Sequence, residues 1–160
     1  MEGSCLLFVC LGNICRSPAA EGVFLHQLQQ RGLEQSFRVD SAGTGHWHAG
    51  QPADARMRAA AAGRSIHLPS RARQIVVADL DAFDHILTMD DDNLAAVQAM
   101  TRGRETKAQI RPITQHCRRH RVREVPDPYY GGADGFERVL DLLDDACAGL
   151  IDDLLASGNN

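Results

Sequence analysis

Two patterns of hydrophobic and polar residues alternate along the chain. Short apolar runs and apolar–polar alternations, bounded by turn-forming residues, predict β-strands. We expect these strands at residues 6–9, 37–42, 84–89 and 110–113. Segments in which apolar residues recur three and four positions apart predict amphipathic helices. We expect the helices at residues 17–31, 54–62, 78–82, 90–100 and 133–155.

Strands that alternate with helices in this way predict an α/β fold, with a mostly parallel sheet covered by helices on both faces. A chain of 160 residues is long enough for one hydrophobic core. We expect a single domain over residues 1–156 and a flexible tail over 157–160. The functional site of such a sheet lies at the carboxyl ends of its strands. The loop that begins at Cys10, residues 46–48 and Asp90 should therefore converge.

The loop between the first strand and the first helix carries the clearest chemical signal. Its sequence is CLGNICR, followed by Ser17 and Pro18, so that Cys10 ends the strand and Arg16 begins the helix. Such a loop can close around a tetrahedral oxyanion, which its backbone N–H groups, the helix N-terminus and the arginine would bind together. The cysteine then lies beneath the anion, placed to attack it. The other residues of this predicted phosphate-binding loop are Leu11, Gly12, Asn13, Ile14, Cys15 and Ser17.

The residues around Cys10 suit a nucleophilic thiol. Only the thiolate is a good nucleophile, and a helix N-terminus and a nearby arginine both favour that form. The hydroxyl of Ser17 can donate a further hydrogen bond to the sulfur. Gly12 and Asn13 tolerate the backbone angles of a tight loop, and Asn13 and Ser17 are candidates for holding its shape. The alternative, a strand-to-helix turn that only happens to contain two cysteines, leaves these coincidences unexplained.

Composition and charge narrow the classes of function. The net charge of −4 and the pI of about 5.9 argue against a nucleic-acid-binding protein. No apolar stretch reaches the roughly 18 residues of a membrane span, so no membrane insertion is expected. Glu2 and the short apolar run do not resemble a signal peptide. The five cysteines lack a disulfide-framework spacing, which favours reduced thiols in the cytoplasm, with export by a non-classical route left open.

Five motifs, in this order, resemble the low-molecular-weight protein tyrosine phosphatases. They are CLGNICRSP at 10–18, SAGT at 41–44, ARQ at 72–74, MD at 89–90 and DPYY at 127–130. The resemblance implies a four-stranded parallel sheet in a flavodoxin-like arrangement and a cysteine-dependent phosphomonoesterase. It assigns Cys10 as the nucleophile, Arg16 as the phosphate clamp and Asp127 as the general acid. No metal or other cofactor is expected, since the cation and the amide dipoles stabilise the charge of the phosphate.

Three of the few aromatic residues fall in loops expected to border the site. Rings of Trp47, Tyr129 and Tyr130 at the rim can stack on a substrate phenyl ring, although partial burial would also explain them. A deep slot with an aromatic rim favours phosphotyrosine, because the shorter phosphoserine cannot reach the thiolate. The expected partner is therefore a phosphotyrosine-containing protein, and phosphate-like oxyanions should inhibit.

Two residues near the catalytic loop have alternative interpretations. Cys15 lies close enough in sequence for a reversible disulfide with Cys10 that would protect an oxidised nucleophile, and the resemblance points the same way; the alternative is a small packed thiol. Asp90 is either a supporting carboxylate or only a helix cap.

Other interpretations have less support. His116, Cys117 and His120 lack further ligands for a metal site. The basic stretch 118–123 is expected as a solvated loop, with docking of an acidic phosphopeptide as the alternative. A thiol-dependent arsenate reductase would need cysteines after the third strand, and residues 75–100 contain none. A module that only binds phosphate would need neither a nucleophile nor an acid, whereas this chain has candidates for both in Cys10 and Asp127. A nucleotide-binding loop would continue as Gly-Lys-Ser/Thr, and this loop does not.

Overall fold

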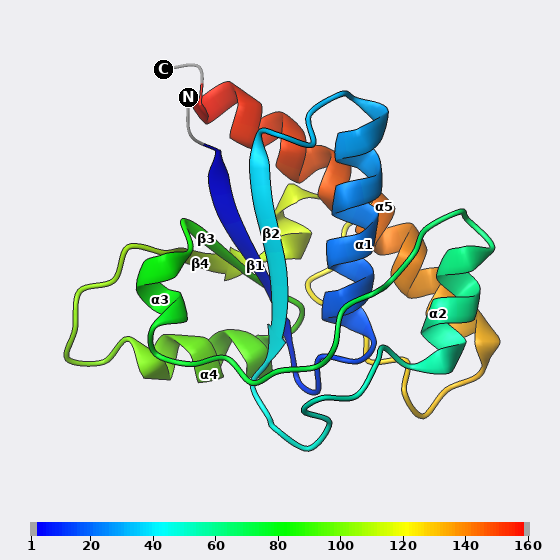
Figure 1. Cartoon of the computed structure of the whole chain (residues 1–160), viewed down its shortest axis with the longest axis horizontal. Coiled ribbons are helices and arrows are strands. Elements are labelled where there is room, and N and C mark those ends of the chain that lie inside the picture. Colours follow the sequence, from blue (N-terminus) through cyan, green and yellow to red (C-terminus); the bar gives the residue numbers. More distant parts are fainter. Residues whose placement is uncertain (1–2, 159–160) are drawn as a thin grey trace.

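The structure is a computed structural model that describes residues 3–158 (Figure 1). Its strands and helices follow one another in the predicted order. The strands are β1 (Ser4–Cys10), β2 (Phe37–Gly43), β3 (His85–Thr88) and β4 (Gln109–Pro112). The helices are α1 (Arg16–Gln30), α2 (Ala55–Ala62), α3 (Asp79–Ala82), α4 (Asp91–Met100) and α5 (Ala133–Gly158). A short 3₁₀-helix, η1 (Ile113–His116), follows β4 and was not predicted.

The four strands form one parallel sheet in the order β2-β1-β3-β4. This confirms the predicted α/β fold with a four-stranded parallel sheet. The chain moves from β1 to one side of the sheet for β2 and to the other side for β3. The carboxyl end of β1 is therefore the point where the strand order reverses, which is where sheets of this kind bind ligands.

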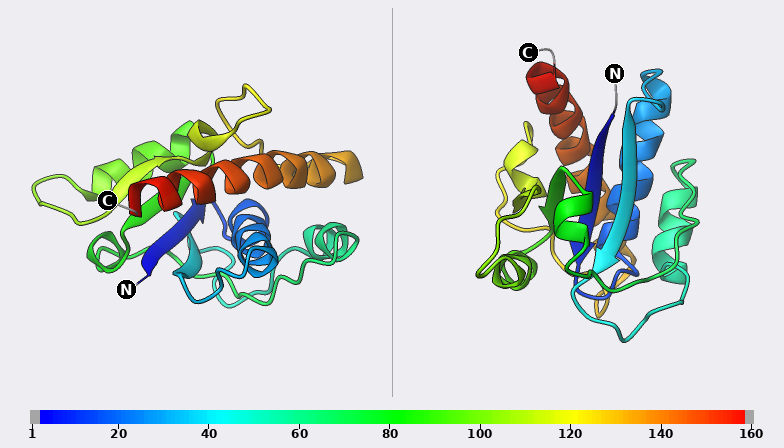
Figure 2. Two further views of the ribbon diagram at one scale, coloured as in Figure 1. Left: turned by 90° about the horizontal axis from the view of Figure 1, so that it is seen from above. Right: turned by 60° about the vertical axis from the view of Figure 1, so that its left-hand side comes forward.

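Helices cover both faces of the sheet (Figure 2). On one face α1 packs against α5, and α2 lies against α5 beside them. Leu6 and Phe8 of β1 belong to the large core on this side. Leu7 and Val9 point the other way, into a smaller core that includes Leu80 of α3 and Val97 of α4.

Local sequence accounts for the helix starts near the site. Asp54 caps α2 by accepting hydrogen bonds from the backbone N–H groups of Arg56 and Met57. Asp90 caps α4 in a reciprocal capping box with Asn93. At the other end of the chain, α5 extends through Gly158, so the tail predicted from residue 157 is helical as far as the structure describes it. No proline interrupts α5, so its helical hydrogen bonding continues to Gly158; residues 159–160 lie outside the described residues.

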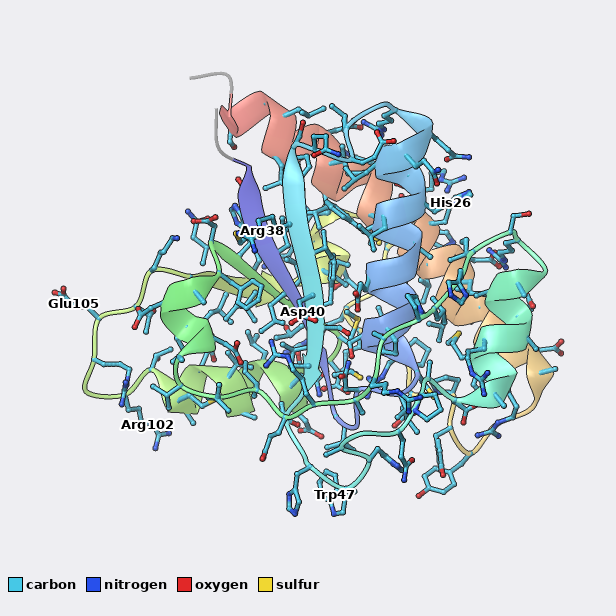
Figure 3. All side chains as sticks on the ribbon, viewed as in Figure 1. His26, Arg38, Asp40, Trp47, Arg102 and Glu105 are labelled. Atoms are coloured by element: carbon cyan, nitrogen blue, oxygen red, sulfur yellow. The ribbon has the colours of Figure 1, made fainter. Side chains whose placement is uncertain are left out.

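The loops after the strands lie at one end of the sheet. Figure 3 shows Trp47 at the lower edge of the molecule, beyond the carboxyl end of β2. The loop after β1 occupies the same end (Figure 1). Within residues 3–158, no helix combines the length and apolar character needed to cross a membrane.

Candidate active site

Asn13 fixes the shape of the loop between β1 and α1. Its backbone lies in the left-handed region with φ of 58°, as the sequence led us to expect. Its side-chain nitrogen donates to the hydroxyls of Ser17 (2.7 Å) and Ser41 (3.0 Å). Its side-chain oxygen accepts from the backbone N–H of Arg73 (3.0 Å). One buried amide thus ties the loop to α1, to β2 and to the segment before α3.

The loop also lies directly on the end of β2. The N–H groups of Thr44 and Gly45 donate to the carbonyls of Cys10 and Leu11, both at 2.9 Å. Gly43 makes this approach possible, because a Cβ at that position would lie 2.7 Å from the Leu11 carbonyl oxygen. The close packing of backbone on backbone leaves the loop little freedom.

Cys10 is buried at the base of this loop, with a relative exposure of 2%. Its sulfur lies 3.0 Å from the Ser17 hydroxyl and accepts a hydrogen bond from the Ser17 backbone N–H at 3.4 Å. Both groups come from the first turn of α1, where the helix dipole also favours negative charge. The sulfur therefore accepts one backbone hydrogen bond and lies within hydrogen-bond distance of one hydroxyl, which could donate to it.

Arg16 is equally buried, with an exposure of 2%, and its guanidinium is only partly paired. One terminal nitrogen, Nη1, donates to Asp90 Oδ2 (2.6 Å) and to the Val125 carbonyl (3.0 Å). The other, Nη2, lies 3.7 Å from Asp127 Oδ2. Burial opposes the charge on Arg16, yet the neighbouring Cys10 and Asp90 raise its pKa. Asp90 is thus both a supporting carboxylate and a helix cap.

Several donors at the site have no partner in the protein. The buried Nε of Arg16 makes no hydrogen bond within residues 3–158. The backbone N–H groups of residues 11–15 likewise donate to no protein atom in the described part of the chain. Buried donors are almost always satisfied, so the unpaired Arg16 Nε, beside the free N–H groups of a loop that lines the same pocket as Cys10, indicates a ligand with several acceptor oxygens. A phosphate group has these acceptors.

A pocket of about 410 Å³ opens above Cys10. Asp127 reaches it from the loop after β4, and its carboxylate accepts a hydrogen bond from the Tyr129 N–H at 3.0 Å. The lining residues are Cys10, Leu11, Gly12, Ile14, Cys15, Arg16, Trp47, His48, Asp127, Tyr129 and Tyr130. The structure thus brings together nearly all the predicted site residues; Asn13 and Ser17 lie behind the wall as supports.

The rim of this pocket is aromatic. Trp47 is 64% exposed and Tyr130 is 94% exposed, so burial does not explain either ring, whereas Tyr129 is half-buried. His48 also lines the pocket, and its ring centroid lies 6.2 Å from that of Tyr129. The sequence analysis assigns no role to His48; its place in the loop after β2 is the signal that points to it.

Cys15 lines the pocket but differs from Cys10 in its surroundings. It is 4% exposed. Burial raises the pKa of the Cys15 thiol to about 12, and the nearby Asp54 and Cys10 add to the effect. Cys15 is therefore a protonated thiol at neutral pH.

The basic stretch 118–123 lies apart from this pocket and is largely paired with acidic residues. Arg118 pairs with Asp153, Arg119 with Asp144, and Arg123 with Asp91. In the same region His116 contacts Asp153 and His120 contacts Asp145. Among residues 3–158, no group of three or more His, Cys, Asp or Glu side chains is arranged to hold a metal ion.

Comparisons with known proteins identify the family. The family model for low molecular weight phosphotyrosine protein phosphatases matches residues 5–159. The low molecular weight protein-tyrosine-phosphatase YfkJ of Bacillus subtilis is 38% identical, over 91% of this chain and 92% of the relative.

Solved structures agree with this assignment. A protein tyrosine phosphatase from Entamoeba histolytica, with Hepes in its active site, superposes with a TM-score of 0.93 at 44% identity, over 99% of this chain and 100% of that chain. Wzb of Vibrio vulnificus, in complex with benzylphosphonate, superposes with a TM-score of 0.79 at 26% identity, over 94% and 99% of the two chains. The chain belongs to the low molecular weight protein tyrosine phosphatases, which are cysteine-dependent hydrolases.

Proposed function

We propose that Cys10, Arg16 and Asp127 hydrolyse phosphotyrosine through a phosphocysteine intermediate. The observation that carries this proposal is a set of donors without a partner in the described structure, in the loop that lines the pocket with Cys10: the buried Nε of Arg16 and the N–H groups of residues 11–15. These donors suit the equatorial oxygens of a phosphoryl group held above the thiolate.

The reaction has two steps. In the first, the Cys10 thiolate attacks phosphorus in line with the phenol oxygen; the S–P bond forms, the P–O bond breaks, and Asp127 gives its proton to the departing oxygen. In the second, water attacks the phosphocysteine while Asp127 takes its proton, which releases inorganic phosphate and the thiolate. Arg16 and the loop N–H groups stabilise the phosphoryl oxygens throughout.

The depth and rim of the pocket favour a phosphotyrosine-containing protein as substrate. Trp47, Tyr129 and Tyr130 offer flat rings at the mouth, while the buried sulfur lies at the base. A phosphoserine side chain is too short to reach that sulfur from the rim. The same donors bind any phosphate-like oxyanion, and relatives hold Hepes or benzylphosphonate. Vanadate and phosphate should therefore inhibit by competing with substrate.

The decisive experiment is steady-state hydrolysis of a phosphotyrosine peptide, with chelator and reducing agent present. Cys10→Ser should abolish activity, and Asp127→Asn should lower kcat/KM about a hundredfold or more. A matched phosphoserine peptide should be hydrolysed far more slowly than the phosphotyrosine peptide. A wild-type protein that is silent under these conditions would overturn the proposal and make arsenate reduction the next assay.

A further part of the proposal concerns oxidation. Peroxide converts the Cys10 thiolate to a sulfenic acid, which the Cys15 thiol then attacks, forming a disulfide and releasing water. The high pKa of Cys15 predicts that this closure is slow at neutral pH and accelerates as pH rises. The test is recovery of activity with thiol after peroxide treatment. Full recovery by Cys15→Ser, equal to that of the wild type, would rule out the protective role.

The absence of disulfide bonds among the cysteines of the described structure supports a cytoplasmic location. All five, from Cys5 to Cys147, are free in the structure. Free thiols persist in reducing compartments, so a cytoplasmic location is the one we propose. Activity that requires a reducing agent after purification in air is the expected result.

A further inference from the structure

We infer that Arg56 is a positioning residue, which holds the loop that carries Asp127 in place through the ring of Tyr129. This loop, residues 126–132, is called the acid loop below. The inference rests on the proposed role of Asp127 as general acid. It concerns a side chain that neither the motifs nor the pocket wall includes, since Arg56 is not among the residues that line the pocket.

The guanidinium of Arg56 is held by three separate parts of the fold. Its Nε and Nη2 donate to the two carboxylate oxygens of Asp54, at 3.1 and 2.9 Å. Its central carbon lies 4.8 Å from the ring centroid of Phe136 and 5.3 Å from that of Tyr129. Both distances are within the range of cation–π attraction. Arg56 therefore bridges α2, the start of α5 and the acid loop, which lie side by side in Figure 1.

Two of these anchors are rigid and one is not. Phe136 is 1% exposed within α5. Asp54 caps α2, and its backbone N–H donates to the carbonyl of Ile14 in the catalytic loop at 2.8 Å. Tyr129, in contrast, belongs to a segment without regular structure. Phe136 and Asp54 hold the guanidinium of Arg56 in place. The cation–π contact with Arg56 therefore fixes the ring of Tyr129 relative to α2 and α5.

The acid loop has few other ties to the protein. The hydrogen bonds of residues 126–132 in the described structure run within the loop or to Gly135 at the start of α5. Outside the acid loop, the Asp127 carboxylate makes only a 3.7 Å ion contact with Arg16 among the described residues. With so few hydrogen bonds beyond itself, the loop depends on side-chain packing, in which the buried Pro128 and the ring of Tyr129, packed against the large core, take part.

Tyr129 is also coupled directly to the acid. Its backbone N–H donates to Asp127 Oδ1 at 3.0 Å, which closes a tight turn between the two residues. Fixing the ring of Tyr129 therefore fixes the carboxylate two positions earlier. Asp54 occupies two of the Arg56 donors, Nε and Nη2, and Arg56 does not line the pocket, so its contact with the site runs through the ring of Tyr129.

Loss of Arg56 should therefore slow hydrolysis mainly for substrates whose leaving group must be protonated. Phenol has a pKa close to that of tyrosine, near 10, so phenyl phosphate requires the acid. The much more acidic p-nitrophenol departs with little help. Arg56→Gln should lower kcat/KM for phenyl phosphate about fivefold and for p-nitrophenyl phosphate less than twofold, as a partial loss of general-acid catalysis. Arg56→Lys, which keeps the charge but not the paired contact with Asp54, should recover part of the loss.

The controls separate positioning from a general effect on the fold. Arg64→Gln removes another arginine of the α2 region, which pairs with Glu137 and Asp141 of α5, away from the pocket. This variant should leave kcat/KM unchanged for both substrates. In an Asp127→Asn background, Arg56→Gln should cause no further loss, because the two changes remove the same function. Thermal unfolding of each variant verifies that it is folded.

The outcomes decide between the two proposals. A selective loss with phenyl phosphate that disappears in the Asp127→Asn background supports the role of Arg56. An equal loss with both substrates, an additive loss in that background, or no loss at all would overturn it. If Asp127→Asn itself affects both substrates equally, the assignment of the general acid fails instead.

Discussion

At the scale of single residues, Arg16 shows how function constrains this fold. It is the largest fully buried side chain in the described structure, and a buried charge costs stability unless it is paired. Asp90 and the Val125 carbonyl satisfy only one of its nitrogens by hydrogen bonds. In the proposed mechanism, the remaining donors gain their partners when a phosphoryl group binds. The residue is therefore better explained by ligand binding than by stability.

Ser17 provides a test of how the loop activates the nucleophile. Ser17→Ala removes the hydroxyl that lies 3.0 Å from the Cys10 sulfur but keeps the backbone N–H. Hydrogen bonds to charged groups contribute about 1.5–3 kcal/mol, so alkylation of Cys10 by iodoacetamide at pH 6 should slow about tenfold. The assay is best run in a Cys15→Ser background, with the exposed Ser36→Ala as control. An unchanged rate would mean that the hydroxyl does not stabilise the thiolate.

At the scale of elements, the end of β2 shapes the catalytic loop as much as the loop's own sequence does. Gly43 pairs with Cys10 across the sheet and lies against the backbone of Leu11 and Asn13. A side chain there would meet backbone atoms, which cannot move aside as a flexible side chain can. Because Gly43 lets the two backbones lie in contact, the sheet holds the backbone N–H groups of the catalytic loop in position.

Gly43→Ala should consequently damage activity more than stability. The added Cβ lies 2.7 Å from the Leu11 oxygen, so the loop must shift by a fraction of an ångström. We expect kcat/KM for a phosphotyrosine peptide to fall about a hundredfold, and the free energy of unfolding by about 1–3 kcal/mol. The matched control is Gly63→Ala, whose Cβ meets its nearest atom at an ordinary 3.4 Å. Equal activity of the two variants would contradict the argument.

The elements and the catalytic loop were predictable because their signals are local. Residue periodicity located every strand and the five α-helices, and the CLGNICR loop combines its functional groups within seven positions. The same signals bring residues 46–48 to the site, but not the contacts of His48 and Arg56 with Tyr129. These contacts join positions 81 and 73 residues apart, and only the packing of loops onto the sheet's end creates them. The extension of α5 beyond residue 156 was missed because small polar residues suit both a helix and a tail.

At the scale of the whole molecule, acidic residues of α5 anchor the chain that returns from β4. Asp145 is 2% exposed and accepts hydrogen bonds from three successive backbone N–H groups, those of residues 118–120. His120 adds a side-chain contact of 2.8 Å. This anchor fixes the segment that leads on to Val125 and the acid loop, so it links the middle of α5 to the site.

The same anchor predicts how stability responds to acid. Burial opposes the charge of Asp145, but hydrogen bonds from Arg118, His120 and Arg119 lower its pKa from 3.8 to about 2. The resulting stabilisation, about 2 kcal/mol, is present above the ordinary pKa and is lost as pH falls from about 5 to about 2. Asp145→Asn should therefore unfold at lower urea concentration at pH 6, with a smaller difference from the wild type at pH 2.5. Asp152→Asn, at an exposed pair, is the control; a constant difference across this range would be inconsistent with the shift.

Two histidines that contact Arg111, His85 and His116, make stability depend on pH in a higher range. Arg111 donates from Nε to His116 Nε2 (2.9 Å), and its Nη1 lies 3.1 Å from His85 Nδ1. This arrangement requires those two imidazole nitrogens to be unprotonated. Burial and the charge of Arg111 lower the pKa of His85; burial also lowers that of His116, outweighing its contact with Asp153.

Because the unfolded chain takes up these protons near the ordinary histidine pKa of about 6.5, stability is full above that pH and declines as pH falls below it. Urea unfolding between pH 8 and 5 should show this decline in the wild type and a shallower one in His85→Gln/His116→Gln. The exposed His67→Gln should keep the wild-type slope. A double variant with an unchanged slope would show that neither histidine is held neutral by the fold, and the acid response would then rest on the carboxylates alone.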